Sequence, residues 1–292
     1  MDTGDLKIFE AVARLGGMNR AAAELNTVQS NVTARIRLLE EELGLPLFHR
    51  HSRGVALTAA GGRLLPYAKR AAGLLEDARH AVADDGEPRG PLAIGSLETT
   101  AGLRLPPILA AYTAAYPEVD LVLRSGTTGE LVQLVLERAL DGAFVCGPVD
   151  HPELAQEVVF RETLVLVTAP AVGSLDALVG RGEPKIVVLR AGCSYRQRLE
   201  DILARRGVIG LRRLEFGTID GIIGCVAAGL GVTLLPRSVA AAAAAEGRVA
   251  LHDLPAAEAE VDTLFIRRRD ALVSSALDAF LTISLKEIEE II

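Results

Sequence analysis

The sequence predicts a multi-domain fold, with a small all-α domain at the N-terminus and a larger α/β domain behind a single linking helix. Three observations predict it. Apolar residues recur with helical spacing over the first 43 residues, a narrow heptad seam runs from residue 64 to residue 82, and short apolar runs alternate with helical patterns from residue 92 onward. At 292 residues, half of them apolar, the chain is long enough to bury more than one core.

The first three predicted helices follow one another closely. Gly16-Gly17 ends the first helix, and Asn19 is expected to cap a short Ala-rich second helix that runs to about Leu25. After a tight break at Asn26-Thr27 comes a third helix, which Gly44 ends. Its expected buried seam has the spacing of one packed face: Val28, Val32, Ile36, Leu39 and Leu43. Three short helices in this arrangement predict a helix-turn-helix, whose third helix lies in the major groove of DNA.

The face opposite that seam is short, polar and partly basic, which suits the reading of DNA bases and phosphates. An ordinary solvated helix face is the alternative. Two short apolar segments around Ser52-Arg53-Gly54 predict a small hairpin beside the helix, a wing with arginines at its tip that can hold the phosphate backbone. The expected DNA contacts are Asn19, Thr27, Gln29, Ser30, Asn31, Thr33, Arg35, Arg37, Arg50 and Arg53.

Charge is distributed unevenly, although the whole chain carries −7. Residues 1–83 hold 11 Lys and Arg against 9 Asp and Glu, whereas residues 84–292 hold 20 against 29. Double-stranded DNA is therefore expected to bind the N-terminal part. No apolar stretch approaches a bilayer span and the first residues are acidic, so we expect a cytoplasmic protein without a membrane partner. The three cysteines lack zinc-ligand or disulfide-dense spacing, and we expect no metal and no cofactor.

The linking helix is expected to begin after Thr58, a natural N-cap. Its narrow seam favours packing against another helix, either on the chain's own domain or on a second copy. Pro66 and Gly73 weaken the isolated helix, and residues 84–91 predict a hinge. The seam consists of Leu64, Ala68, Ala71, Leu75, Ala78 and Val82.

The remaining two hundred residues predict alternating β and α elements. Helices are expected near 103–116, 129–140, 195–206, 219–228 and 274–290. Strands are expected at Leu92 to Gly95, Asp120 to Leu123, Gly142 to Val145, Leu164 to Thr168, Ile186 to Leu189, Arg213 to Phe216, Val232 to Leu235 and Thr263 to Arg267.

Small hydroxyl-bearing loops join several of these strands to the following helices. Helix N-termini offer free N–H groups and a positive dipole end, so a cleft where several converge would favour a small carboxylate ligand. The alternative is that each loop is only an N-cap. Glu98 would repel a plain acid, which makes an amino-acid-like or betaine-like ligand a hypothesis. The candidate ligand residues are Ser96, Glu98, Thr99, Thr100, Gly126, Thr127, Thr128, Cys146, Cys193, Ser194 and Thr218.

Two other functions are alternatives to ligand-responsive DNA binding. Cys193 or Ser194 stands at a strand-to-helix turn where a nucleophile could be activated, but no G-x-S-x-G elbow or histidine partner accompanies it, so we expect no enzyme. A redox sensor is the second alternative, although Cys193 and Cys225 have no visible resolving arrangement.

Five segments together resemble the N-terminal signature of the LysR-type transcriptional regulators: Ala21 to Leu25, Val28 to Ser30, Ile36 to Gly44, Leu47 to Arg50 and Leu57 to Gly61. Residues 121–142 and 227–236 are also similar to stretches common in that family. One departure is Ala34, where the family usually places Arg or Lys.

The resemblance implies a two-lobed, periplasmic-binding-protein-like domain with a small-molecule effector between its lobes. It also implies a homodimer paired through the linking helices and a homotetramer, with RNA polymerase as a further partner. The expected boundaries are 1–58 for the DNA-binding domain, 59–83 for the dimerisation helix, 84–91 for the hinge and 92–292 for the effector domain. Within the last, lobe I takes about 92–161 and 268–292, and lobe II about 162–267.

Overall fold

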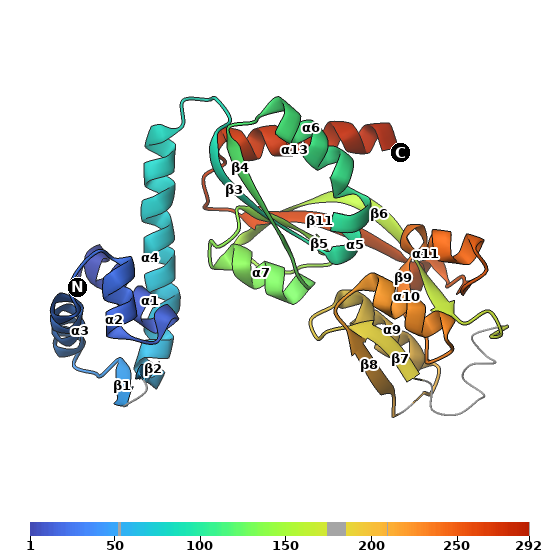
Figure 1. Ribbon diagram of the computed structural model, residues 1–292, viewed down its shortest axis with the longest axis horizontal. Coiled ribbons are helices and arrows are strands. Elements are labelled where there is room, and N and C mark those ends of the chain that lie inside the picture. Colours follow the sequence, from blue (N-terminus) through green and yellow to red (C-terminus); the bar gives the residue numbers. More distant parts are fainter. Residues whose placement is uncertain (52–53, 174–184, 209, 292) are drawn as a thin grey trace. The chain divides into compact units, whose positions relative to one another are not determined.

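The computed structural model describes residues 1–51, 54–173, 185–208 and 210–291. The chain divides into two compact units, Met1–Asp85 and Gly86–Ile292, which are described separately (Figure 1). Among the described residues, no helix is both long enough and apolar enough to cross a membrane.

The first unit packs three short helices against a two-stranded hairpin and the start of a long helix. An Asp2 capping box opens α1, whose C-cap is the left-handed Gly16, as the sequence predicts. The hairpin is antiparallel and pairs Phe48 with Leu57. These elements are α1 (Thr3–Leu15), α2 (Met18–Glu24), α3 (Gln29–Leu43), β1 (Phe48–His51), β2 (Gly54–Leu57) and α4 (Ala59–Ala83).

Two sequence predictions within this unit are wrong. Gly17, not Asn19, is the N-cap of α2, because the second helix begins one residue after Gly17 and already includes Asn19. The buried seam of α3 is shorter than the apolar pattern indicates: it contains Val32, Ile36 and Leu39. Val28 is 64% exposed and Leu43 is 38% exposed, since both stand at helix ends beyond the reach of α1 and α2.

Helix α4 begins at the predicted N-cap, where the Thr58 hydroxyl accepts the Gly61 N–H. Pro66 is inside the helix, which nevertheless continues to Ala83. Only the first part of the heptad seam is covered within the chain, with Ala68 fully buried. Leu75 is 38% exposed and Val82 is 90% exposed, so the second half of α4 presents an uncovered apolar strip.

The second unit is built on one seven-stranded mixed sheet and a smaller two-stranded sheet. The large sheet has the order β10-β6-β11-β5-β3-β4, and β9 pairs with β6 off this path. Its strands are β3 (Gly90–Ser96), β4 (Val119–Ser125), β5 (Gly142–Cys146), β6 (Leu154–Thr168), β9 (Thr233–Pro236), β10 (Ala250–His252) and β11 (Glu260–Arg268). The small sheet is formed by β7 (Lys185–Leu189) and β8 (Arg212–Phe216), which run parallel.

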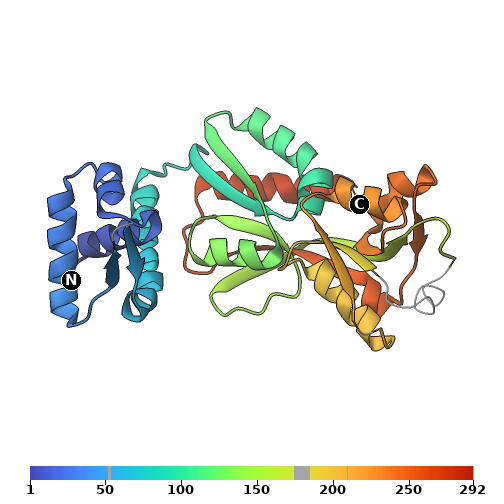
Figure 2. The same ribbon diagram turned by 60° about the horizontal axis from the view of Figure 1, so that its bottom comes forward.

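Two long antiparallel strands, β6 and β11, join the halves of this unit (Figures 1 and 2). The first half of β6 pairs with β11, whereas its second half, from Leu164, pairs with β9 and β10. We call the half with β3, β4 and β5 lobe I and the half with β7 to β10 lobe II. The sequence predicts only the second half of β6, because Gln156, Glu157 and Arg161 interrupt its apolar pattern.

Helices cover both faces of the lobe I sheet (Figure 1). On one face, α6 and α13 lie side by side, with the Tyr112 ring edge-on to Phe280. On the other face α7 packs through Leu131 and Val135. The lobe I helices are α5 (Glu98–Leu103), α6 (Leu105–Ala115), α7 (Thr128–Leu136) and α13 (Ser275–Ile291); those of lobe II are α9 (Ser194–Arg205), α10 (Ile219–Ala227), α11 (Arg237–Ala245) and α12 (Ala256–Ala259).

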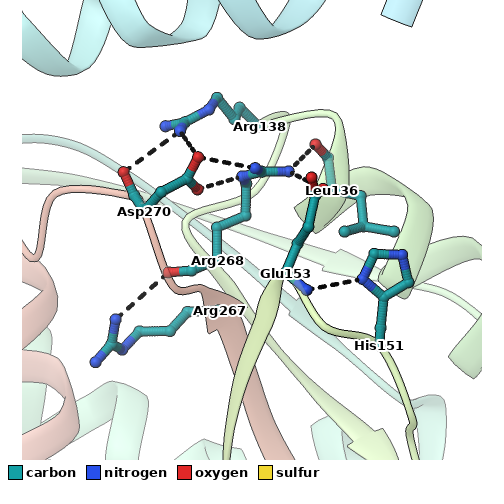
Figure 3. Close-up of polar contacts among 7 residues, drawn as sticks. All are labelled: Leu136, Arg138, His151, Glu153, Arg267, Arg268 and Asp270. Atoms are coloured by element: carbon teal, nitrogen blue, oxygen red, sulfur yellow. Dashed lines mark hydrogen bonds and ion pairs between the residues drawn. The ribbon is translucent and has the colours of Figure 1, made fainter.

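A cluster of ionic side chains fixes one end of lobe I (Figure 3). The Arg268 guanidinium, 3% exposed, donates to Asp270 at 2.7 and 2.9 Å, to Glu153 at 3.0 Å and to the Leu136 carbonyl at 3.0 Å. Arg138 makes a further ion pair with Asp270 at 3.1 Å. The cluster therefore ties the end of β11 to the start of β6 and to the end of α7.

Gly90 and Pro91, which the sequence assigns to the hinge, are the first residues of β3 and pair with Val119 and Asp120 of β4. The sequence also misses α5, α11, α12 and the short strand β10, and the predicted loop with Thr99 and Thr100 is helical, since both belong to α5. An unbroken alanine run, Ala240 to Ala245, has no polar face from which helical spacing could be read, although the structure places Ala240 and Ala243 in the core.

Candidate functional site

The outer face of α3 is open to solvent and polar. Gln29, Ser30, Asn31 and Arg37 are exposed there, and Thr33 is half-buried. The first three stand in the first turn of the helix, where the Asn31 N–H donates to the Val28 carbonyl at 3.1 Å. The Asn31 amide donates to the Thr27 hydroxyl at 3.0 Å, which orders the turn that leads into the helix. The face can therefore donate to, and accept from, the edges of nucleic-acid bases.

Arg35 has a different environment from its neighbours. Its guanidinium donates to Asp2 at 2.9 Å, and its Nε lies 2.6 Å from Asp5 as an ion pair without hydrogen-bond alignment. Both carboxylates belong to the N-terminal turn of α1. Arg35 thus contacts α1 within the chain, whereas Arg37 is exposed and available to an external anion. The sequence did not reveal this contact because 30 residues separate Arg35 from Asp5.

Glu40 joins α3 to the wing. Its carboxylate accepts the backbone N–H groups of Leu47 at 2.8 Å and Phe48 at 3.2 Å, and Arg50 donates to it at 3.2 Å. Sequence reasoning did not single out this glutamate, since nothing local distinguishes it from the adjacent Glu41. Of the other predicted contacts, Asn19 is exposed on α2, and Arg53 lies outside the described residues.

A cavity of about 280 Å³ lies between the two lobes of the second unit. It is bounded by the ends of strands and the first turns of the helices that follow them, which is the usual ligand position in open α/β sheets. Its lining includes five of the predicted residues: Glu98, Thr99, Gly126, Thr127 and Cys193. The other lining residues are Leu97, Ser125, Leu189, Arg190, Tyr195, Phe216 and Gly217.

Six predicted residues lie outside that lining. The buried Ser96 hydroxyl donates to the Leu97 carbonyl at 3.0 Å. Thr218 caps α10 by accepting the Gly221 N–H, which is the simple N-cap role that the sequence left open. The six predicted residues that do not line the cavity are Ser96, Thr100, Thr128, Cys146, Ser194 and Thr218.

Side chains bridge the two lobes at several points around the cavity. The Glu98 carboxylate of lobe I accepts the Ile219 N–H at the start of α10 at 3.1 Å. Ser194 at the start of α9 donates to the Thr128 hydroxyl of α7 at 3.0 Å. Arg190, after β7, makes an ion pair of 3.6 Å with Glu130. The cleft walls are therefore held together by the protein's own polar groups.

The first turn of α7 is a complete capping box. The Glu130 carboxylate accepts the Thr127 N–H at 2.8 Å and the Thr127 hydroxyl at 3.0 Å. These bonds hold the pKa of Glu130 below its ordinary value, first through the Thr127 N–H, so the carboxylate is ionised at neutral pH.

The cysteines near the cleft are poor nucleophiles. Burial raises the pKa of the Cys146 thiol to about 11 and also raises that of Cys193. A raised pKa keeps both as thiols at neutral pH, which disfavours catalysis and oxidation alike. Among the described residues, no group of three or more His, Cys, Asp and Glu side chains could hold a metal ion.

Tyr195, Phe216 and Arg190 are the lining residues whose chemistry sequence reasoning missed. Tyr195 and Arg190 were detectable, since they flank the predicted Cys193 and Ser194 at the same strand-to-helix turn. Phe216 ends a predicted strand and gave no local signal beyond that of an ordinary core residue.

Comparison with known proteins agrees with both units. The model of the bacterial regulatory helix-turn-helix protein, lysR family, matches residues 3–62, and that of the LysR substrate binding domain matches residues 85–288. The HTH-type transcriptional regulator GltR of Bacillus subtilis is 45% identical over 95% of this chain and 94% of its own length.

Solved structures of full-length regulators have the same fold. A full-length OxyR variant from Pseudomonas aeruginosa aligns with a TM-score of 0.71 at 20% identity, over 99% of this chain and 95% of that chain. CbnR complexed with its target DNA aligns with a TM-score of 0.63 at 24% identity, over 98% of this chain and all of that one. The chain therefore belongs to the LysR family of DNA-binding transcriptional regulators, with an N-terminal helix-turn-helix and a C-terminal effector-binding domain.

Proposed function

We propose that this regulator reads its operator with the outer face of α3 and answers to a small molecule held in the cleft between lobes I and II. The observation that carries the DNA part is the exposed polar first turn of α3, with Gln29 and Ser30 beside the basic Arg37. Arg50, which also pairs with Glu40 at 3.2 Å, and Arg53 contribute contacts to the phosphate backbone, whereas Arg35 lies between two carboxylates, Asp2 and Asp5, and acts within the chain.

The effector site is the 280 Å³ cavity, and Glu98, Thr99, Thr127 and Cys193 contact the ligand. Its volume suits a metabolite of modest size, and its walls come from two lobes joined by β6 and β11. A ligand that binds both walls shifts the population between closed and open arrangements of the lobes. That shift changes how paired DNA-binding units are spaced on the operator.

The active protein is a dimer, and a tetramer follows from the family's organisation. The uncovered apolar strip of α4, with Leu75 and Val82, supports pairing through this helix. A two-fold dimer reads a palindromic operator in the cytoplasm, where RNA polymerase is its further partner.

The redox and enzymatic alternatives are not favoured. Cys146 and Cys193 have raised pKa values and therefore carry little thiolate, and no base accompanies either thiol among the described hydrogen bonds.

The test is DNA binding by the full chain to fragments from upstream of its own gene. We expect footprints of two-fold symmetry with half-sites one helical turn or a multiple apart, and an affinity that falls steeply with salt. A screen of small metabolites by thermal shift should then find a compound that changes the footprint. A monomeric protein without salt-sensitive DNA affinity would refute the proposal.

A further inference from the structure

The cleft of the proposed effector site is already supplied with carboxylates by the protein. At α10, the Glu98 carboxylate accepts the Ile219 N–H, the first free donor of that helix. At α7, Glu130 accepts the N–H and the hydroxyl of Thr127. Two of the helix N-termini that could attract an anionic ligand are therefore occupied by glutamates of this chain.

The cationic side chain at the cleft is also engaged. Arg190 lines the cavity, and its Nε is 3.6 Å from the Glu130 carboxylate. Glu98, Glu130 and Arg190 together carry a net negative charge at neutral pH. A carboxylate entering this cleft would therefore compete with Glu98 and Glu130 for the helix N-termini and for Arg190.

Glu98 keeps unused acceptor capacity on the cleft side. Its Oε1 accepts the Ile219 N–H, and no described residue donates to its Oε2. The side chain is half-buried and lines the cavity, so the second oxygen retains room for a donor from a bound molecule. Tyr195 and Phe216 line the same cavity, and aromatic rings stabilise a cation placed over their faces.

From these contacts we infer that the effector carries a positively charged nitrogen, which pairs with Glu98, and that Glu98 selects against plain carboxylates. The inference rests on the cleft being the effector site. It assigns to Glu98 the role of a specificity-determining residue with two acceptors: Oε1 binds α10 of lobe II, and Oε2 binds the ligand.

The experiment uses Cys193 as a reporter of charge in the cleft, because it lines the same cavity as Glu98. Burial raises the pKa of the Cys193 thiol, so both reagents are applied at pH 9, where a larger fraction of it is thiolate. The full-length protein is treated with a cationic reagent, trimethylammonioethyl methanethiosulfonate, or an anionic one, sulfonatoethyl methanethiosulfonate. Peptide mass mapping follows Cys193 separately from Cys146 and Cys225. Each rate is divided by the rate of the same reagent with mercaptoethanol, which removes differences in intrinsic reactivity.

We expect the normalised rate at Cys193 to be roughly tenfold higher for the cation than for the anion, on the scale of one partly solvated charge. Glu98→Gln keeps an amide oxygen for Ile219 but removes the charge, and it should lower this ratio at least threefold. Any change in thiolate fraction affects both reagents equally and cancels in the ratio. Glu118→Gln, on the exposed surface of lobe I, is the matched control and should leave the ratio unchanged.

If the wild-type protein reacts equally fast with both reagents, or faster with the anion, the inference of a cationic effector is overturned. The proposed effector site would survive this result, because the reagents would have entered the cleft. A cation preference that survives Glu98→Gln would remove Glu98 from its role. If neither reagent modifies Cys193 in the folded protein even at pH 9, while both modify it at that pH in urea, small molecules do not reach this wall of the cleft, and it is the proposed effector site that fails.

Discussion

At the scale of single residues, partners decide which side chains can act outward. Arg35 and Arg37 are two positions apart on one helix, yet Arg35 is held by Asp2 and Asp5, and Arg37 is exposed. Glu98 and Glu130 likewise use backbone and hydroxyl donors of the protein. Residue type sets what a group can bind, and its neighbours set whether that capacity remains available.

Gln29 and Arg37 should affect DNA binding in different ways. Gln29→Ala should reduce the discrimination between operator and mutated operator by about 1–3 kcal/mol, because it removes a base contact. Arg37→Ala should weaken binding to every sequence and reduce the salt slope by about 1, because it removes a phosphate contact. Fluorescence anisotropy across salt concentrations measures both. The control is Arg79→Ala, which removes one side of an ion pair on α4. If Arg37→Ala leaves the salt dependence of DNA affinity unchanged, Arg37 does not contact a phosphate.

Glu40 should matter for stability although it lies next to the DNA-binding face. Glu40→Ala leaves the Leu47 and Phe48 N–H groups without their acceptor, so unfolding free energy should fall by about 1–3 kcal/mol. Urea denaturation measures this free energy through the unfolding transition of the N-terminal unit. The adjacent exposed Glu41→Ala should cost less than about 0.5 kcal/mol. Equal effects of the two substitutions would show that the bonds contribute nothing specific.

At the scale of elements, two features depend on how helices and strands pack: the apolar strip of α4 and the Arg268 cluster. Helix α4 is covered only in its first part, and its remaining apolar strip is exposed within the single chain. The ends of α7, β6 and β11 meet at the Arg268 cluster, which fixes where the long strands leave lobe I (Figure 3). Each element is thus defined by what it packs against.

A charge in the α4 strip should break the dimer. Leu75→Glu places a carboxylate in the heptad seam, and its desolvation on pairing is unfavourable. Sedimentation velocity should show dissociation at concentrations where the wild-type protein is associated, together with weaker operator binding. Asp77→Ala, on the opposite side of α4, should leave the association state unchanged. An unaltered mass for Leu75→Glu would place the interface elsewhere.

The Arg268 cluster should make stability depend on pH. Hydrogen bonds from Arg268, then the charge of Arg138, lower the pKa of Asp270 to about 2. A carboxyl whose folded pKa lies below its unfolded value of about 3.9 contributes stability at neutral pH, and this contribution is lost as pH falls from about 5 to 2. Asp270→Asn should therefore be less stable than the wild type at pH 7, and the two should converge near pH 2.

Thermal unfolding at several pH values follows this convergence. Asp150→Asn, at an exposed position of the same lobe, serves as the control. A stability difference that stays constant from pH 7 to pH 2 would show that Asp270 does not titrate as described.

At the scale of the whole molecule, the second unit works as two lobes joined by β6 and β11 and bridged across a cavity. The bridges come from side chains far apart in sequence: Glu98 with Ile219, and Thr128 with Ser194. A ligand shifts the equilibrium between open and closed lobes only by the difference in its affinity for the two states. Weak polar bridges keep the free-energy difference between these states small enough for a small ligand to shift it.

Loss of one bridge should loosen both walls of the cleft. Thr128→Val removes the acceptor of Ser194, and the Cys146 N–H also loses its acceptor, at 3.3 Å. Hydrogen–deuterium exchange should rise in the first turns of α7 and α9 together. Thr113→Val, whose hydroxyl bonds only within α6, should leave these segments unchanged. An increase confined to α7 would show that the bridge does not couple the lobes.

The sequence by itself determined the elements whose signals are local. Gly16 and Gly44 end their helices, Thr58 starts α4, and the alternating pattern gives the β/α order of the second unit. Predicted strands match β3, β4, β5, β7, β8, β9 and β11 to within a few residues. These agree because caps, periodicity and turn chemistry act over a few residues, a range that the sequence displays directly.

Only the tertiary structure decided which side chains remain available for a partner. It assigned Arg35 to α1 and Glu40 to the wing, exposed Val28, extended β6 beyond its apolar half, and set Tyr195 and Phe216 in the cleft with Glu98. The physical reason is that hydrogen bonds and burial depend on distance in space. Residues 121 positions apart, such as Glu98 and Ile219, become partners only when two lobes close on each other.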